Sequence, residues 1–191
     1  FINVIERKPN DKNLSFGSSW LHQDTSYLAN DRPRYTMLMG IEIPTGQGNT
    51  IFSSGFKAYE KLPNKIKDKI KKATGIFSSA GPIAVTRLER EKEMGIVSSK
   101  SMEAEHPLVR AVNGKKTLYV SPGHLMKVKN VSKQDADYLK NYLIEHVNKK
   151  EFIFSYEWTK GDICLWDNLS ILHMASEIKN CRRIMHRITI K

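Results

Sequence analysis

Short apolar runs that end at glycine- or proline-containing turns account for most of this chain, and they leave room for few helices. The longest run, YTMLMGIEIP at 35–44, predicts a largely buried strand that ends in the turn at 44–48. Further strands are expected at 50–53, 118–121, 152–158, 163–166 and 183–190. This pattern predicts a mainly β fold, a sandwich or jelly roll with flanking helices on its outside.

Two stretches carry helical periodicity instead. One or two helices are expected in 54–72, interrupted at Pro63, because proline breaks a helix interior. Ser132 is suited to cap a second helix, and Asp135 follows in its first turn. An apolar stripe then recurs at helical spacing. Its members are Tyr138, Leu139, Tyr142, Leu143 and Val147.

The 191 residues contain no internal repeat or proline-rich linker, so a single domain over 1–191 is expected. The charged stretch 86–105 has no clean periodicity. A long structureless segment in a compact domain suggests a mobile lid, and the other interpretation is that residues are missing from the numbering there. Because the chain opens at Phe1 rather than Met, we expect a fragment that lacks an N-terminal segment.

The chain is basic, with 31 Lys and Arg against 20 Asp and Glu, a net charge of +11. The densest basic run is 61–72, where Leu62, Ile66 and Ile70 recur at helical spacing and place the lysines on the opposite, solvated face. No aromatic residues interleave these lysines, as a surface that stacks bases requires. We therefore expect no nucleic-acid partner, although a basic surface favours an anionic small substrate.

No stretch approaches the roughly 18 to 20 apolar residues that cross a bilayer, so no membrane partner is expected. Cys164 and Cys181 lack the paired spacing of a zinc site and are interpreted as reduced thiols of a cytoplasmic protein. The sequence leaves the oligomeric state open and is compatible with a homo-oligomer.

A histidine and a carboxylate stand two residues apart at His22 and Asp24. In an extended segment such positions point to the same side, so both side chains can meet one ion. His173 is the candidate third ligand, because it follows a strand and turn and precedes an arginine-bearing strand. Two histidines and one carboxylate with open positions are typical of non-haem iron(II) oxygenases, and a catalytic zinc site uses the same ligand types.

Seven stretches of the chain match family motifs, and they follow one another in the order and at about the spacing that those motifs have. They are WLHQDTSY at 20–27, GIEIP at 40–44 with GNTIF at 48–52, AYEKLP at 58–63, EHPLVR at 105–110, GKKTLYV at 114–120, WDN at 166–168 followed by His173, and RRIMHR at 182–187. Together they resemble the motifs of the TauD/TfdA family, the taurine dioxygenase-like enzymes. Leu21 is a departure, since it stands between the tryptophan and the histidine of the family pattern.

The resemblance implies a double-stranded β-helix, a jelly-roll or cupin-like core, with Fe(II) and 2-oxoglutarate at its mouth. The implied enzyme is an oxidoreductase, a dioxygenase that takes dioxygen, 2-oxoglutarate and a small-molecule substrate, hydroxylates that substrate, and releases succinate and carbon dioxide. The metal ligands carried over are His22, Asp24 and His173. Thr50 and Arg183 match the residues that bind the far carboxylate of 2-oxoglutarate, for which the planar fork of arginine is suited.

Three further positions are implied to contact the substrate. Arg187 lies four residues beyond Arg183, on the same side of the expected strand, and matches an arginine that commonly binds a sulfonate or carboxylate. His124 stands where the taurine enzymes have a phenylalanine, which argues against copying taurine as the substrate. Trp166 is expected beside the metal, where a dry, shaped cavity is needed.

Two alternatives of other classes stay open at this point. One is a zinc-dependent hydrolase that uses the same three ligands, which would have no use for Thr50 and Arg183. The other is a non-catalytic jelly-roll binding module, whose signature would be the loss of a ligand, and none is lost. A halogenase is disfavoured because those relatives lack the carboxylate ligand, whereas Asp24 is present.

Overall fold

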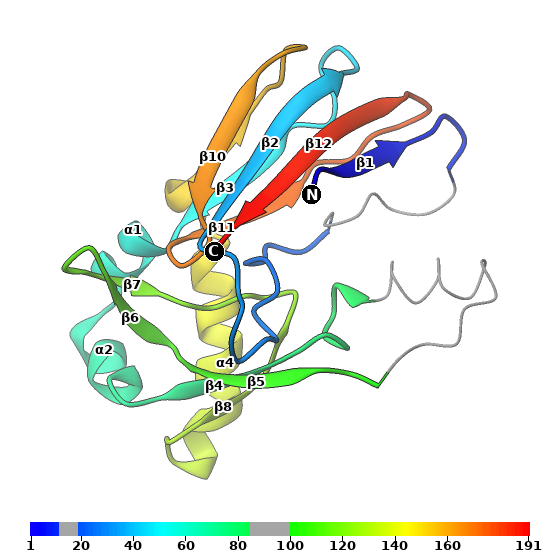
Figure 1. Cartoon of the computed structure of the whole chain (residues 1–191). Coiled ribbons are helices and arrows are strands. Elements are labelled where there is room, and N and C mark those ends of the chain that lie inside the picture. The colour runs from blue at the N-terminus through cyan, green and yellow to red at the C-terminus, as the bar shows by residue number, and fades with distance from the viewer. Residues whose placement is uncertain (12–18, 85–99) are drawn as a thin grey trace.

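The computed structural model describes residues 1–11, 19–84 and 100–191, and two antiparallel sheets form its upper half in Figure 1. The larger sheet has the order β1-β12-β2-β10 and the smaller sheet the order β11-β3-β9. The strands of the larger sheet are β1 (Asn3–Arg7), β2 (Tyr35–Glu42), β10 (Ile163–Asp167) and β12 (Arg183–Ile190). Those of the smaller sheet are β3 (Thr50–Ser54), β9 (Ile153–Tyr156) and β11 (Ile171–Ala175).

The two sheets enclose a core built from alternate residues of their strands. Strand β2 alternates between buried and less buried positions, which is the pattern of a strand with one face on a core. Leu38 of β2, Phe52 of β3, Trp166 of β10 and Met185 of β12 meet in one cluster. Strands β1 and β12, from opposite ends of the chain, lie side by side (Figure 1). This two-sheet sandwich confirms the predicted jelly-roll class.

The segment that contains His22 extends the smaller sheet beyond β11. The backbone N–H of His22 donates to the carbonyl of His173 at 3.0 Å, and the N–H of His173 donates back at 2.9 Å. This pair of bonds fixes the two histidines opposite each other, although the 150 residues between them include most of the fold. The bridge therefore brings side chains from distant segments of the chain together at one end of the sandwich.

A second layer lies below the sandwich in Figure 1. Among the described residues it contains a sheet of order β5-β4-β8, the hairpin β6-β7 and the helices α1, α2 and α4, all around a separate core. Its strands are β4 (Thr74–Ser78), β5 (Glu103–Pro107), β6 (Val109–Val112), β7 (Lys115–Leu118) and β8 (Leu125–Lys129). Its helices are α1 (Gly55–Glu60), α2 (Asn64–Ile70) and α4 (Lys133–Val147), with a short 3-10 helix at Lys150–Phe152.

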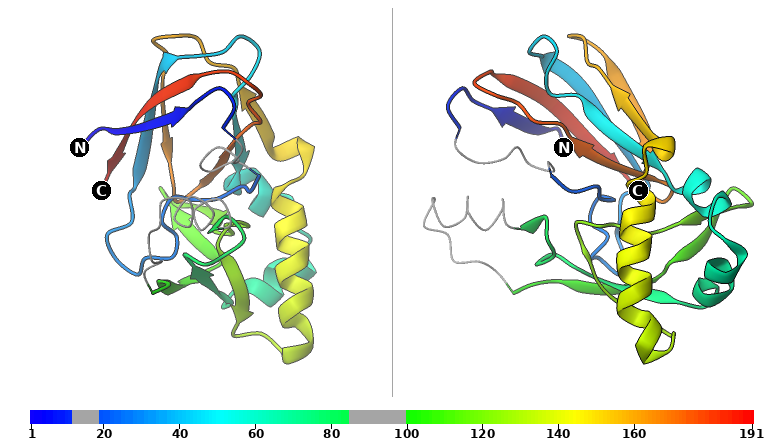
Figure 2. Two further views of the ribbon diagram at one scale, coloured as in Figure 1. Left: turned by 90° about the vertical axis from the view of Figure 1, so that its right-hand side faces the viewer. Right: turned by 180° about the vertical axis from the view of Figure 1, so that it is seen from behind.

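The long helix α4 runs along the side of this layer (Figure 2). Ser132 caps it by accepting a hydrogen bond from the Asp135 N–H, as predicted. Leu139, Leu143 and Val147 are buried, whereas Tyr138 is 53% exposed and does not belong to the core.

Helix α2 is amphipathic as predicted. Leu62, Ile66 and Ile70 are buried in the core of this layer, and most lysines of the run lie at exposed positions. The basic run thus forms a solvated helix face.

The strand expected at 118–121 is wrong by three residues, because β7 ends at Leu118. The turn before it has positive φ at both Asn113 and Gly114, and this tight hairpin sets the register that pairs Val109 with Leu118. One further backbone hydrogen bond, from the Tyr119 N–H to the Leu108 carbonyl at 2.8 Å, follows the end of the strand, and Tyr119 is a buried core residue outside it. Most of the stretch 86–105 lies outside the described residues, and its last three residues belong to β5.

A histidine of β5 holds the loop at 25–33 against the second layer. His106 donates from Nε2 to the Leu28 carbonyl at 3.0 Å, and Arg32 donates to the carbonyls of Leu28 and Ala29 at 3.0 and 2.9 Å. Burial and the adjacent Arg32 lower the pKa of His106 to about 4, so the ring is neutral at pH 7 and accepts a hydrogen bond from Arg32. In the described part of the chain, no helix has the length and hydropathy to span a bilayer.

Leu143→Ala is expected to lower the free energy of unfolding by about 2–5 kcal/mol, because it leaves a cavity in a fully buried site. Tyr138→Ala, on the same helix but exposed, should cost less than about 1 kcal/mol. Urea denaturation at pH 7 measures both values. Equal losses for the two variants would show that α4 packs through a different face.

Candidate metal centre

Three buried side chains converge at the end of the sandwich that the His22–His173 bridge defines. Nε2 of His22 lies 3.9 Å from Oδ1 of Asp24, and Nε2 of His173 lies 3.7 Å from the same oxygen. All three potential ligand atoms lie within 4.8 Å of one another. Atoms that each bind an ion at about 2.0–2.2 Å are separated by no more than about twice that distance. The two separations from Asp24, 3.9 and 3.7 Å, lie below this limit, so the arrangement is compatible with a single ion.

The tautomer of His22 suits this arrangement. Its Nδ1–H donates to the carbonyl of Trp20 at 3.0 Å, so the lone pair on Nε2 faces Asp24. Such a backbone partner on the far nitrogen is typical of a histidine that binds a metal. Nδ1 of His173 is buried and has no hydrogen-bond partner among the described residues.

The protonation states also suit a cation. Burial, followed by the proximity of His22, lowers the pKa of His173 to about 3, and burial lowers that of His22 as well. Burial alone would raise the pKa of Asp24, but His173, Arg187, His22 and the Thr36 hydroxyl outweigh it and lower that pKa to about 2. At neutral pH the three side chains are thus two neutral imidazoles and one carboxylate.

A small cavity next to the triad is lined by Thr50 and Arg183, together with both histidines. Arg183 is 5% exposed, and its Nε and Nη2 have no hydrogen-bond partner among the described residues. Burial lowers its pKa to about 10, which leaves the guanidinium charged at neutral pH. Thr50 accepts a hydrogen bond from the Trp158 indole at 2.9 Å, so its own hydroxyl hydrogen remains to donate.

Gly48 makes room for this arginine. It has a φ of +72°, and a Cβ there would lie 2.7 Å from Cδ of Arg183. A buried cation with unused donors, a hydroxyl beside it and a glycine that admits it together form a site for an anionic group.

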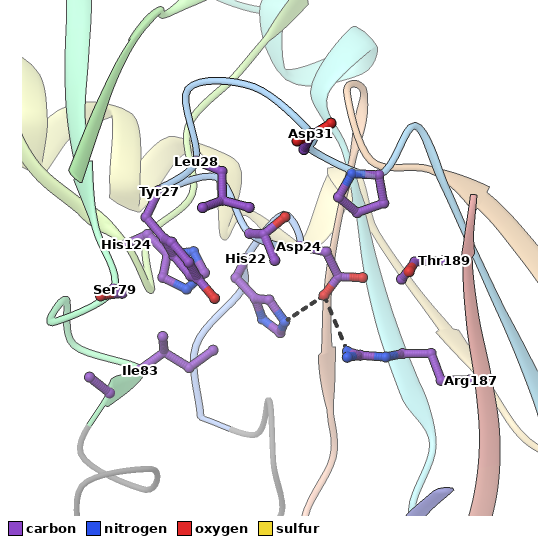
Figure 3. Close-up of a pocket in the computed structure, with 13 residues that line it drawn as sticks. His22, Asp24, Tyr27, Leu28, Asp31, Ser79, Ile83, His124, Arg187 and Thr189 are labelled. Atoms are coloured by element: carbon purple, nitrogen blue, oxygen red, sulfur yellow. Dashed lines mark ion pairs between the residues drawn. The ribbon is translucent and has the colours of Figure 1, made fainter. Parts of the chain in front are cut away.

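A larger cavity of about 240 Å³ opens on the other side of the triad (Figure 3). Its walls include the loop at 25–33, His124 and Arg187, which lines both cavities. Nη1 of Arg187 lies 3.5 Å from Oδ1 of Asp24. Arg187 therefore stands at the boundary between the two cavities, next to Asp24.

His124 is held by two serines in the wall of the larger cavity. Ser121 accepts from the Gln23 N–H at 3.0 Å, and its hydroxyl lies 3.2 Å from Nδ1 of His124. The Ser26 hydroxyl lies 2.9 Å from the same nitrogen. A hydroxyl can donate to a ring nitrogen or accept from it, so the two serines fix the orientation of the His124 ring through Nδ1 and leave Nε2 without a bond to either serine.

Trp166 packs against His173, with ring centroids 4.6 Å apart, and lines the smaller cavity rather than the larger one. The structure thus brings the predicted residues Thr50, Arg183 and Trp166 together on one side of the triad. It brings His124 to the other side. A groove of about 470 Å³ outside the sandwich is larger than either cavity, but of the predicted site residues it touches only Trp166.

The sequence interpretation missed several residues that support this centre. Thr36 donates to Asp24 and accepts from Asn168, and both are buried. A polar residue at an inward position of an apolar strand is the signal that could have identified Thr36. The pairing of His106 with Arg32 and Leu28, which holds the cavity loop, carries no local signal because these residues are distant from His106 in sequence.

Comparison with known proteins agrees with this geometry. The family model described as "Taurine catabolism dioxygenase TauD, TfdA family" matches residues 2–189. An alkylsulfatase of Acinetobacter baylyi is 33% identical over 184 residues, covering 91% of this chain and 56% of that protein. An alpha-ketoglutarate-dependent sulfate ester dioxygenase of Pseudomonas putida is 28% identical over 184 residues, covering 91% of this chain and 59% of that protein.

Among solved structures, a taurine dioxygenase from Burkholderia xenovorans matches with a TM-score of 0.75 and 26% identity, over 98% of this chain and 63% of that one. The chain thus spans less than two thirds of the length of these proteins. Because the family model covers nearly every residue and the fold agrees, the chain belongs to the TauD/TfdA family of dioxygenases.

Proposed function

We propose that this protein is an Fe(II)- and 2-oxoglutarate-dependent dioxygenase that hydroxylates a small anionic substrate. The observation that carries the proposal is the pairing of two sites that border one small cavity. One is the buried triad of His22, Asp24 and His173, and the other is buried Arg183, whose Nε and Nη2 have no hydrogen-bond partner in the described part of the chain. Membership of the family implies 2-oxoglutarate and a metal, and the residues present fit both.

His22, Asp24 and His173 would hold the ion from one side. A face of three ligands leaves positions for a bidentate cosubstrate and dioxygen, which is the arrangement of non-haem iron(II) oxygenases. When bound, the iron supplies the oxidising chemistry that uses dioxygen and 2-oxoglutarate and yields succinate, carbon dioxide and a hydroxylated product. The protein's own contribution is to orient the reactants and to exclude water from a buried centre.

Arg183 and Thr50 would bind the far carboxylate of 2-oxoglutarate. The guanidinium offers two unused donors in a planar fork, and the Thr50 hydroxyl adds a third. A zinc-dependent hydrolase has no cosubstrate that would require this buried cation. Because an unpaired buried charge is costly, a binding module without a cosubstrate would also gain nothing from Arg183.

The larger cavity would bind the prime substrate. Arg187 would supply a cation on one wall, and His124 would present its imidazole ring from the opposite wall. The named activities of the relatives on sulfate esters, and taurine for the structural neighbour, favour an anionic sulfo group. Trp166 would act indirectly, by packing against His173.

The proposal covers a single domain that takes no nucleic-acid or membrane partner. The two cysteines, Cys164 and Cys181, are unpaired, which supports a reducing, cytoplasmic location. Small molecules and dioxygen are the partners that the cavities accommodate.

Removal of the carboxylate ligand tests the metal centre. Asp24→Ala is expected to weaken Co(II) binding at least about 100-fold, more than loss of an outer partner typically costs, and to abolish succinate formation. Asp31→Ala is the matched control, because this exposed carboxylate lines the same cavity but pairs with Lys191. Calorimetric titration of the metal-free proteins gives both affinities. Unchanged Co(II) binding by Asp24→Ala would exclude it as a ligand.

The two arginines should divide the anions between them. Arg183→Ala is expected to weaken 2-oxoglutarate binding to the Co(II)-loaded protein roughly 30-fold or more, since a desolvated charge loses its partner. Arg187→Ala should change that affinity little and instead raise KM for an alkyl sulfate or sulfonate substrate. Arg182→Ala, an exposed neighbour paired with Glu6 and Glu42, should change neither.

Identical effects of the Arg183 and Arg187 variants on both ligands would contradict this division. A true substrate without an anionic group would contradict the role of Arg187 alone.

A further inference from the structure

We propose that Thr36, Asn168 and Trp166 form a buried hydrogen-bond relay that positions Asp24 as a one-oxygen metal ligand. This inference rests on the proposed metal centre and goes beyond it, because none of these contacts involves the ion itself. The three are positioning residues that act through the Asp24 carboxylate.

The direction of every hydrogen bond in the relay is fixed by chemistry. The Trp166 indole can only donate, and its Nε1 lies 3.2 Å from Oδ1 of Asn168. This bond sets the orientation of the amide, whose Nδ2 donates to Oγ1 of Thr36 at 2.7 Å. The Thr36 hydroxyl, having accepted that bond, donates its own hydrogen to Oδ2 of Asp24 at 2.6 Å.

Each member of the relay is sequestered from solvent. Thr36 is fully buried, Asn168 is 2% exposed and Trp166 is 6% exposed. Thr36 pairs across the sheet with Trp166 of β10 and with Thr189 of β12, so the backbone on both sides holds it. Three buried polar groups are tolerated here because each satisfies the next, and the ionised carboxylate terminates the relay.

The relay explains which oxygen of Asp24 faces the ion. Oδ2 is occupied by Thr36, whereas Oδ1 lies 3.9 Å from Nε2 of His22 and 3.7 Å from Nε2 of His173. A carboxylate that offers one oxygen uses one coordination position. The remaining positions then stay open for a bidentate cosubstrate and dioxygen.

Trp166 connects this relay to a second ligand. Its ring packs on His173 at 4.6 Å while its N–H begins the relay to Asp24. One side chain therefore restrains two of the three ligands. This gives a physical role to the WDN motif, of which the tryptophan and the asparagine are the first and last residues.

Thr36→Val keeps the shape of the side chain but removes the donor to Asp24. We expect it to weaken Co(II) binding about 10- to 100-fold, the usual effect of losing a partner of a metal ligand. Thr36→Ser, which retains the hydroxyl, should restore most of the affinity. Ser53→Ala is the matched control, because it removes another fully buried hydroxyl bond, to the Val147 carbonyl, outside both cavities.

The rise in Tm that saturating Co(II) causes separates positioning from plain stability. Ligand-induced stabilisation depends on the ligand's affinity for the folded protein. Ser53→Ala should lower the Tm of the metal-free protein and keep the full rise, whereas Thr36→Val should show a reduced rise. Asn168→Ala, which leaves the Thr36 hydroxyl without its anchor, should show a smaller reduction and serves if Thr36→Val does not fold.

Full Co(II) affinity and a full rise in Tm for both Thr36→Val and Asn168→Ala would overturn the relay. That result differs from failure of the metal centre. If the wild-type protein and Asp24→Ala bound Co(II) equally, the proposed ligands themselves would be wrong. The relay alone is wrong if Asp24→Ala weakens Co(II) binding but Thr36→Val binds Co(II) with the affinity of the wild-type protein.

Discussion

Two backbone hydrogen bonds between His22 and His173 are the constraint on which the rest of the site depends. They join a loop near the start of the chain to β11 and align two imidazoles above one carboxylate. Such a contact forms easily in a β-sandwich, because strands that are distant in sequence lie next to each other in its sheets. The sheets beneath then hold the converging side chains rigidly.

Burial gives the centre its chemical character. Both imidazoles are neutral and Asp24 is ionised, as a divalent cation requires. Arg183 stays charged despite its burial, and its Nε and Nη2 have no hydrogen-bond partner among the described residues. A buried charge of this kind costs free energy in the absence of a ligand. The arrangement is therefore best explained by bound ligands, a cation at the triad and an anion at Arg183. The proposed relay from Trp166 to Asp24 would orient the Asp24 carboxylate so that Oδ1 faces the two histidines.

The sequence predicted the strands with strong alternation, such as β2 and β12, and it predicted α4 from its cap and apolar stripe. It could not predict β4, β5 or β11, whose short, mixed sequences become strands only through pairing with distant partners. The proposed metal ligands followed from spacing and from resemblance to a family. Thr36 did not, because its partners Asp24 and Asn168 are close in space alone. The dual position of Arg187, beside both cavities, also depends on tertiary structure.

An anaerobic titration of the wild-type protein with Fe(II) and 2-oxoglutarate tests the central claim most directly. A weak visible metal-to-ligand band should appear only when both are present and should saturate at one equivalent of each. Its appearance would require a chelated cosubstrate on iron held by the triad. Absence of the band at saturating concentrations of a folded protein would contradict the account, because the triad and Arg183 would then not form one site.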